Sequence, residues 1–117
     1  TAQDDTFARS VAALERVDPK AASSAYTTAL KRWPQHHALL LGAGNAAYAL
    51  GDLPSAQSAY EAAVQAHPDF ADAWNNLAQV MLDLGNRPGA AQSIARAVTV
   101  GGPRLPQYLD LQRVIVR

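Results

Sequence analysis

Residues 60–64, Tyr60-Glu61-Ala62-Ala63-Val64, have counterparts 34 residues before and 34 residues after them in the chain. Residues 26–30 read Tyr-Thr-Thr-Ala-Leu, and residues 94–98 read Ile-Ala-Arg-Ala-Val. An alanine stands four residues before each copy, at Ala22, Ala56 and Ala90. A period of this size is typical of a stack of helix–turn–helix units, which offers an extended binding surface and no catalytic pocket.

The segments between these copies have the pattern of a further helix and a turn. Apolar residues at helical spacing run through residues 40–50 and again through residues 74–84. Gly51 suits the left-handed position that ends a helix, and Pro54 suits the first turn of the next one. We therefore predict a single domain over residues 1–117, with three repeats over about 4–34, 37–68 and 71–102 and a capping helix over about 105–116.

Several packing details can be predicted from the same register. Small residues recur where two helices should cross closely, at Gly44, Ala56, Ala63, Ala78, Ala90 and Ala97. We expect Leu50 and Leu84, which end the apolar stripes, to be buried as well. Asp69 is expected to cap the helix that follows it. The first repeat is one residue shorter between Val17 and Ala22, as is common for a terminal repeat.

Composition narrows the class of protein. The chain is rich in alanine, the best helix former, and no run alternates β-branched and polar residues, so we expect an all-α fold. It has no cysteine, which excludes disulfides, thiolate metal sites and cysteine nucleophiles. No apolar stretch is long enough for a membrane span. Because the chain begins at Thr1 without a leader, we expect a processed protein or a piece of a longer one.

The net charge is zero, but the charges are unevenly distributed. Between Trp33 and Asn86 there is no Lys or Arg, whereas five acidic residues lie from Asp52 to Asp83. From Arg87 onwards arginines dominate, but they are spaced singly along the predicted helices and are not interleaved with aromatic residues. A nucleic-acid site is therefore not expected.

The third repeat carries the pattern Trp74-x-x-Leu77-Ala78-x-x-Met81-x-x-Leu84-Gly85, followed by Ala90-x-x-x-Ile94-x-x-Ala97. This pattern resembles the tetratricopeptide repeat (TPR). The second repeat matches the family through residues 44–68, but it has Leu40 where an aromatic residue is usual and Ala47 where tyrosine is usual. The resemblance implies a right-handed solenoid that binds proteins, with no enzymatic activity and no cofactor.

A second resemblance concerns a larger protein. Residues 50–53, residues 73–78 and the Gly-Gly-Pro at residues 101–103 look like the repeats that follow a papain-like, bacteriocin-processing-type cysteine peptidase domain in bacteria. The resemblance, with the high alanine and low lysine content, implies a bacterial protein of the cytoplasm or periplasm. A catalytic domain of that type would lie outside this chain, because the chain has no cysteine.

The TPR resemblance also implies where a ligand would lie, because the first helix of each pair lines the concave groove in that family. Asparagine and glutamine side chains there can pair with the backbone of an extended peptide of any sequence, although such residues are also common on solvated surfaces. The candidate peptide-binding residues on these helices are Leu41, Asn45, Tyr48, Asn75, Asn76, Gln79 and Asp83.

Some family members grip a chaperone's C-terminal carboxylate with cations and two asparagines. Asn45 and Asn76 match the two asparagines, but the cationic positions fall on Leu41, Pro106 and Asp110. The resemblance therefore argues against carboxylate binding, and acidic residues at the groove edge favour a neutral or basic segment.

The sequence contains no pattern typical of a catalytic site or a metal site. His36, His37 and His67 are expected to be surface residues beside turns, and no His, Asp or Glu pair has ligand spacing on one helix face, so no metal is expected. No Gly-x-Ser-x-Gly turn brackets a serine. The expected function is a protein-interaction or scaffold module. Two alternatives stay open: a non-catalytic accessory domain of a larger enzyme, and self-association through Val114 and Val116 of the last helix.

Overall fold

The computed structural model describes residues 2–14 and 18–117, and every regular element in that part of the chain is an α-helix. The helices are α1 (Ala2–Leu14), α2 (Pro19–Arg32), α3 (His37–Ala49), α4 (Leu53–Ala66), α5 (Ala71–Asp83), α6 (Arg87–Val100) and α7 (Leu105–Ile115). The prediction of an all-α fold is confirmed. Val17, where the predicted shortening of the first repeat begins, lies outside the described residues. None of the described helices has the length and apolar content that a membrane crossing requires.

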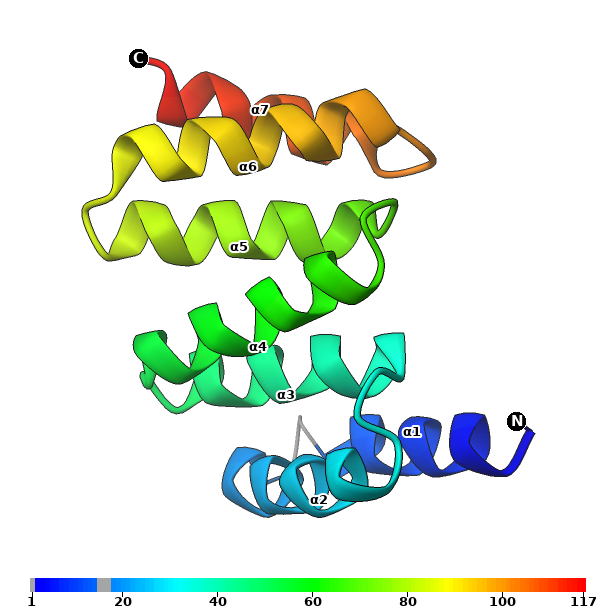
Figure 1. Cartoon of the computed structure of the whole chain (residues 1–117). Helices are drawn as coiled ribbons and strands as arrows, with labels where there is room; N and C mark the ends of the chain where they lie inside the picture. The colour runs from blue at the N-terminus through cyan, green and yellow to red at the C-terminus, as the bar shows by residue number, and fades with distance from the viewer. Residues whose placement is uncertain (1, 15–17) are drawn as a thin grey trace.

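The helix pairs stack in chain order, from one end to the other of an elongated body that measures 41 × 27 × 22 Å (Figure 1). Each helix packs against the next one in sequence. In addition, α1 contacts α3 and α5 contacts α7, so the first helices of successive pairs lie along one side of the stack. This is the arrangement of a helical-repeat solenoid.

The turn between α3 and α4 has the same form as the turn between α5 and α6. After α3 the backbone NH of Asp52 donates to the carbonyl of Ala47, and that of Gly51 donates to Tyr48, at 2.9 and 3.0 Å. Gly51 has φ +78° and Gly85, in the equivalent turn, has φ +85°, a region that favours glycine. Asp52 then caps α4, because its side chain accepts a hydrogen bond from the NH of Ser55. Backbone groups at the end of α3 and at the start of α4 therefore find hydrogen-bond partners within the turn.

Small residues allow the helices of one pair to approach closely, as predicted. A methyl group added at Gly44 of α3 would overlap the ring of Tyr60 on α4. Ala56, Ala63, Ala78, Ala90 and Ala97 are completely buried. A methyl group added at Gly42 would likewise overlap the ring of Tyr26 on α2, in the preceding pair. The sequence analysis did not predict this second close contact. Glycine is therefore required on two different sides of α3.

The predicted burial of Leu50 and Leu84 is wrong, because these side chains are 47% and 44% exposed. Each is the C-cap residue of its helix, where the chain already turns away from the core. Leu39 and Val80 are instead completely buried. A helix inside a stack has neighbours before and after it, so it buries more than the single stripe that a two-helix contact requires.

The predicted Asp69 cap is also wrong. The helix α5 begins at Ala71, so Phe70 is its N-cap residue, and no side chain caps it there. Phe70 instead packs against the central core and edge-on against the ring of His37. Since the phenyl group is anchored in this way, the N-cap position falls one residue beyond the carboxylate that was expected to serve it.

The closing helix α7 is attached to α5 by a polar cluster. The hydroxyl of Tyr108 donates to Asp72 at 2.5 Å, and Arg104 forms an ion pair with the other oxygen of Asp72 at 3.1 Å. Arg87 donates to the carbonyl groups of Val114 and Ile115 at the C-terminal end of α7. These contacts fix α7 on the last helix pair, as a capping helix should be.

Overpacking at the pair contact provides a test of this packing. Ala63→Leu should lower the free energy of unfolding by about 1–3 kcal/mol, because the larger side chain has no room between α3 and α4. Ala62→Leu, at the exposed neighbouring position, should leave stability nearly unchanged. Urea unfolding of both variants measures the difference, and equal stabilities would contradict the packing described here.

The Tyr108 contact predicts how stability depends on pH. Burial first, and then the hydrogen bond to Asp72, raise the pKa of Tyr108 from 10.0 to about 12. The folded state therefore holds this proton more tightly than the unfolded state, so the stabilisation is complete below pH 10.0 and is lost as the pH rises through about 12. Urea midpoints across this range should fall more steeply for the wild type than for Tyr108→Phe, and equal slopes would contradict the assignment.

Candidate functional site

Four of the predicted site residues surround one cavity between α3 and α5. The cavity has a volume of about 250 Å³ and is lined by Asn45, Tyr48, Tyr60, Asn76 and Gln79. We call it the α3–α5 pocket. Tyr60 comes from α4 and belongs to the repeated motif of residues 60–64, but it was not among the predicted binding residues, so it is an addition to that set. Its ring lies on Gly44, and this placement brings its hydroxyl to the pocket.

Asn45 is the centre of the pocket's hydrogen bonds. Its Oδ1 accepts from the hydroxyl of Tyr60 at 2.7 Å and from Nδ2 of Asn76 at 3.1 Å. These two bonds use both lone pairs of the amide oxygen. One bond joins the two helices of a pair, and the other joins that pair to the next, so Asn45 is a structural residue as well as a pocket residue.

A carboxylate lies next to the pocket. The hydroxyl of Tyr48 donates to Oδ2 of Asp83, and Nε2 of Gln79 donates to Oδ1 of the same carboxylate at 2.9 Å. The hydrogen bond to Asp83 is the main cause that raises the pKa of Tyr48, followed by burial and by the negative charge of Asp83. Asp83 thus lies beside the pocket, one hydrogen bond away from two of its lining residues.

The remaining predicted residues have different surroundings. Asn75 donates through Nδ2 to Oδ1 of Asn76 at 3.1 Å, so it supports the pocket from outside its lining. Leu41 is half-buried and packs against the central core. The pocket therefore brings together Asn45, Tyr48, Asn76 and Gln79, with Asp83 and Asn75 next to it and Leu41 apart from it.

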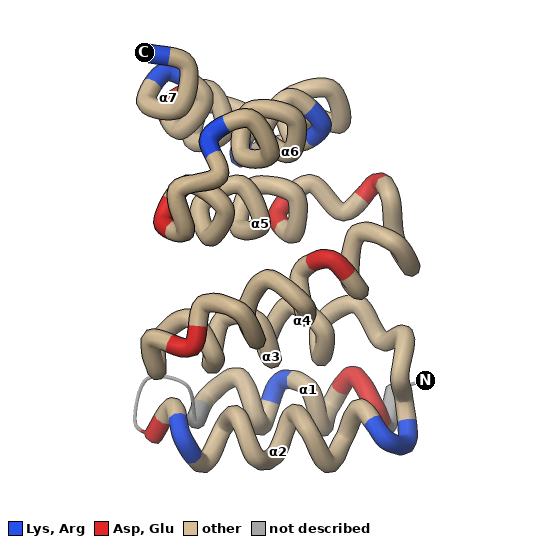
Figure 2. The backbone as a smooth tube through the Cα atoms, turned by 60° about the vertical axis from the view of Figure 1, so that its left-hand side comes forward, with Lys and Arg blue, Asp and Glu red and all other residues tan. Residues whose placement is uncertain are grey.

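The charge around the pocket has one sign. Lys and Arg lie on α1, α2, α6 and α7, whereas the charged residues of α4 and α5 are all acidic and α3 has no charged Lys, Arg, Asp or Glu side chain (Figure 2). Asp72 of α5 is already engaged by Tyr108 and Arg104. Asp83 is left as the carboxylate that borders the pocket, and its described hydrogen bonds come from neutral donors.

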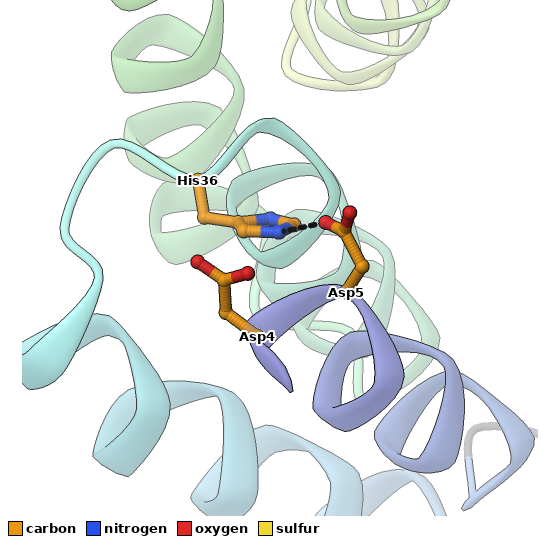
Figure 3. Close-up of side chains that lie close together, drawn as sticks. All are labelled: Asp4, Asp5 and His36. Atoms are coloured by element: carbon orange, nitrogen blue, oxygen red, sulfur yellow. Dashed lines mark hydrogen bonds and ion pairs between the residues drawn. The ribbon is translucent and has the colours of Figure 1, made fainter. Parts of the chain in front are cut away.

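A second polar group lies near the N-terminal end of the stack. Asp4, Asp5 and His36 point toward one another from α1 and the start of α3 (Figure 3), and their potential ligand atoms lie within 4.8 Å of one another. Sequence analysis missed this group because it compared ligand spacing only along single helices. The side chain of His36 is also largely covered, at 9% exposure, and is not the surface turn residue that was expected.

The hydrogen bonds of His36 define its tautomer. Its Nδ1 accepts from the backbone NH of Leu39 at 3.4 Å and so caps α3, which leaves the ring proton on Nε2. Nε2 lies 2.8 Å from Oδ1 of Asp5, to which it donates. A metal bound at Nε2 would need that lone pair, while Nδ1 would then have to carry the proton and lose its helix-capping role. The group therefore fits a link between the first two repeats better than a metal site.

The double role of Asn45 can be measured. Asn45→Ala should lower the free energy of unfolding by about 1 kcal/mol, because it removes the acceptor of Tyr60 and Asn76. The loss should be smaller when the same change is made in a Tyr60→Phe background. Urea unfolding of the four proteins gives the coupling energy, and strictly additive losses would contradict the hydrogen bond between the two side chains.

Comparisons with known structures agree with this fold. The first TPR domain of Spaghetti, solved with an HSP90 peptide, has a TM-score of 0.89 at 15% identity, covering 99% of this chain and 92% of that chain. The TPR2B domain of yeast Sti1, in complex with pHsp70, has a TM-score of 0.88 at 20% identity, covering 99% and 98%. The Sgt2 TPR domain from Aspergillus fumigatus has a TM-score of 0.85 at 21% identity, covering 99% and 80%.

The sequence itself identifies the family. Among curated proteins, no sequence matches the chain significantly. The family model of the tetratricopeptide repeat, however, matches two overlapping segments, residues 7–56 and 41–107, which together include most of the chain. The matched segments contain the close pair contacts, the glycine turns and the α3–α5 pocket. The chain therefore belongs to the tetratricopeptide repeat family.

Proposed function

We propose that this protein is an interaction module that binds an extended segment of a partner protein along the side formed by the first helices of its pairs. The observation that supports this function is the α3–α5 pocket, where amide and phenol groups meet on that side of the stack. The proposed contact residues are Leu41, Asn45, Tyr48, Asn75, Asn76, Gln79 and Asp83.

The amides suit an extended backbone because each offers donors and an acceptor. Internal bonds fix their orientation in advance: Asn75 holds Asn76, and Asn76 holds Asn45. A ligand then meets groups that are already ordered, which lowers the entropic cost of binding. Within the part of the chain that the structure describes, the Nδ2 group of Asn45 has no acceptor of its own, so it is available to a peptide carbonyl.

The charge distribution favours a neutral or basic segment. Since α3 and α5 carry no Lys or Arg, the pocket has no cation with which to hold an acidic peptide. Where carboxylate-binding TPR domains have cations, this chain has Leu41, Pro106 and Asp110, none of which is positively charged. This protein therefore shares its fold with chaperone-binding TPR domains but is proposed to differ from them in ligand charge.

The module is proposed to act by binding alone, without chemistry of its own and without a cofactor. The groups in the pocket are amides, phenols and one nearby carboxylate, and these are arranged to hydrogen-bond to each other. A non-catalytic domain within a larger enzyme, such as a cysteine peptidase, would have the same binding role.

Peptide selection tests the binding function. A displayed library of random peptides should yield binders to the wild type, and these should shift the NMR signals of the Asn45, Asn76 and Gln79 side-chain amides. Gln79→Ala should weaken the selected peptides, whereas Gln65→Ala, on the α4 side of the stack, should not. Failure to select any peptide, or shifts confined to the α4 and α6 surface, would overturn the proposal.

The proposed preference for a neutral or basic ligand over an acidic one has a separate test. The acidic HSP90 peptide SRMEEVD should bind more weakly than a version in which both glutamates are replaced by lysine. The difference should shrink as salt is added, because the charges involved are exposed. Fluorescence anisotropy with labelled peptides measures both affinities, and tighter binding of the acidic form would contradict the assignment.

Self-association through α7 is a second candidate, which rests on the exposure of Val114 and Val116, at 41% and 63%. If α7 mediates it, sedimentation should give a smaller mass for Val114→Asp than for the wild type. Equal masses would remove this candidate.

A further inference from the structure

The carboxylate of Asp83, beside the α3–α5 pocket, is placed at a cost to its own helix. Asp83 lies in the last turn of α5, where the helix dipole makes a negative charge unfavourable. Its carboxylate is nevertheless fixed in place, since Tyr48 and Gln79 each donate to one of its oxygens. A charge that is costly for its own helix but held by two pocket residues is more readily explained by a ligand than by folding.

The carboxylate of Asp83 can accept further hydrogen bonds besides the two described. A carboxylate offers about four lone-pair sites, and the bonds described for Asp83 occupy one on each oxygen. The two donors are neutral, so they orient the charge without cancelling it. Both remaining sites belong to one rigid, planar group, which is the geometry that two parallel N–H donors can meet.

The walls of the pocket select the shape of such a donor. Tyr48 and Tyr60 contribute phenol rings, and Asn45 and Asn76 contribute planar amides. A volume of about 250 Å³ admits one long side chain but not a folded element. Guanidinium groups stack on aromatic rings and pair with carboxylates through a fixed fork, whereas the ammonium group of lysine acts as a compact point charge.

Resting on the proposed function, we infer that the α3–α5 pocket receives one arginine side chain of the bound segment, with its guanidinium group paired to both oxygens of Asp83. The aliphatic part of the side chain lies against the ring of Tyr48. At the opposite end of the pocket, Nδ2 of Asn45 donates to a backbone carbonyl of the same segment. The pocket thus binds a side chain of the ligand at one end and the backbone of the ligand at the other.

The tyrosine–carboxylate contact agrees with this assignment. The pKa of Tyr48 is raised, so its hydroxyl stays a donor to Asp83 throughout the physiological range. The carboxylate is therefore held in the same orientation whether or not a ligand is present, and an arginine would meet an acceptor that needs no rearrangement.

Selection against two matched variants tests the inference. A displayed library of random peptides is selected on the wild type, on Asp83→Asn and on Asp69→Asn. Asp83→Asn keeps an oxygen acceptor and relieves the repulsion at the end of α5, so it should fold. Asp69→Asn removes the same charge from an exposed turn that borders another cavity, with His37 and Phe70, and controls for the net charge.

Arginine should be enriched at one fixed position among peptides selected by the wild type and by Asp69→Asn, and the enrichment should disappear with Asp83→Asn. Enrichment that survives in Asp83→Asn, or peptides without any arginine preference, would overturn the arginine pocket while leaving peptide binding intact. If the wild type selects no peptide, the proposed function itself fails, and the inference fails with it.

A selected peptide allows a quantitative comparison. Replacing its arginine by citrulline, which keeps the shape but removes the charge, should weaken binding to the wild type about tenfold. The same replacement should change binding to Asp83→Asn much less, and lysine should give an intermediate affinity. Equal losses in the two proteins would show that the arginine binds elsewhere, which contradicts the inference.

Discussion

The close approach of α3 and α4 is the contact on which the rest of the structure depends. Gly44 has no side chain, so the ring of Tyr60 can lie directly on the α3 backbone. Only at this short separation does the Tyr60 hydroxyl reach Asn45, at 2.7 Å. Asn45 in turn accepts from Asn76 of the next pair. An apolar packing constraint inside one repeat therefore sets the position of the polar groups between two repeats.

This coupling makes the candidate site part of the scaffold. The amides of the α3–α5 pocket are held by one another, and the carboxylate of Asp83 is held by Tyr48 and Gln79. A pocket ordered in this way differs from flexible surface side chains, because most of its orientation has been fixed by folding. It also means that some substitutions in the pocket alter stability and binding together, so matched controls are needed to separate the two effects.

Much of this architecture could be predicted from the sequence. The 34-residue period fixed the helix pairs, and the glycine turns followed from local backbone chemistry. Burial was predicted less well: Leu50 is exposed and Leu39 is buried, because one apolar stripe does not describe a helix with neighbours on two sides. The grouping of Asp4, Asp5 and His36, and the hydroxyl of Tyr60 in the pocket, depend on contacts between distant residues that no local pattern encodes.

The most direct test is a structure of the protein with a bound peptide. If the amides between α3 and α5 form the binding site, the peptide backbone should lie along that side of the stack, with a carbonyl within hydrogen-bond distance of Nδ2 of Asn45. A peptide found on the α4 and α6 side, with the α3–α5 pocket left as it is in the free protein, would contradict the role assigned to that pocket.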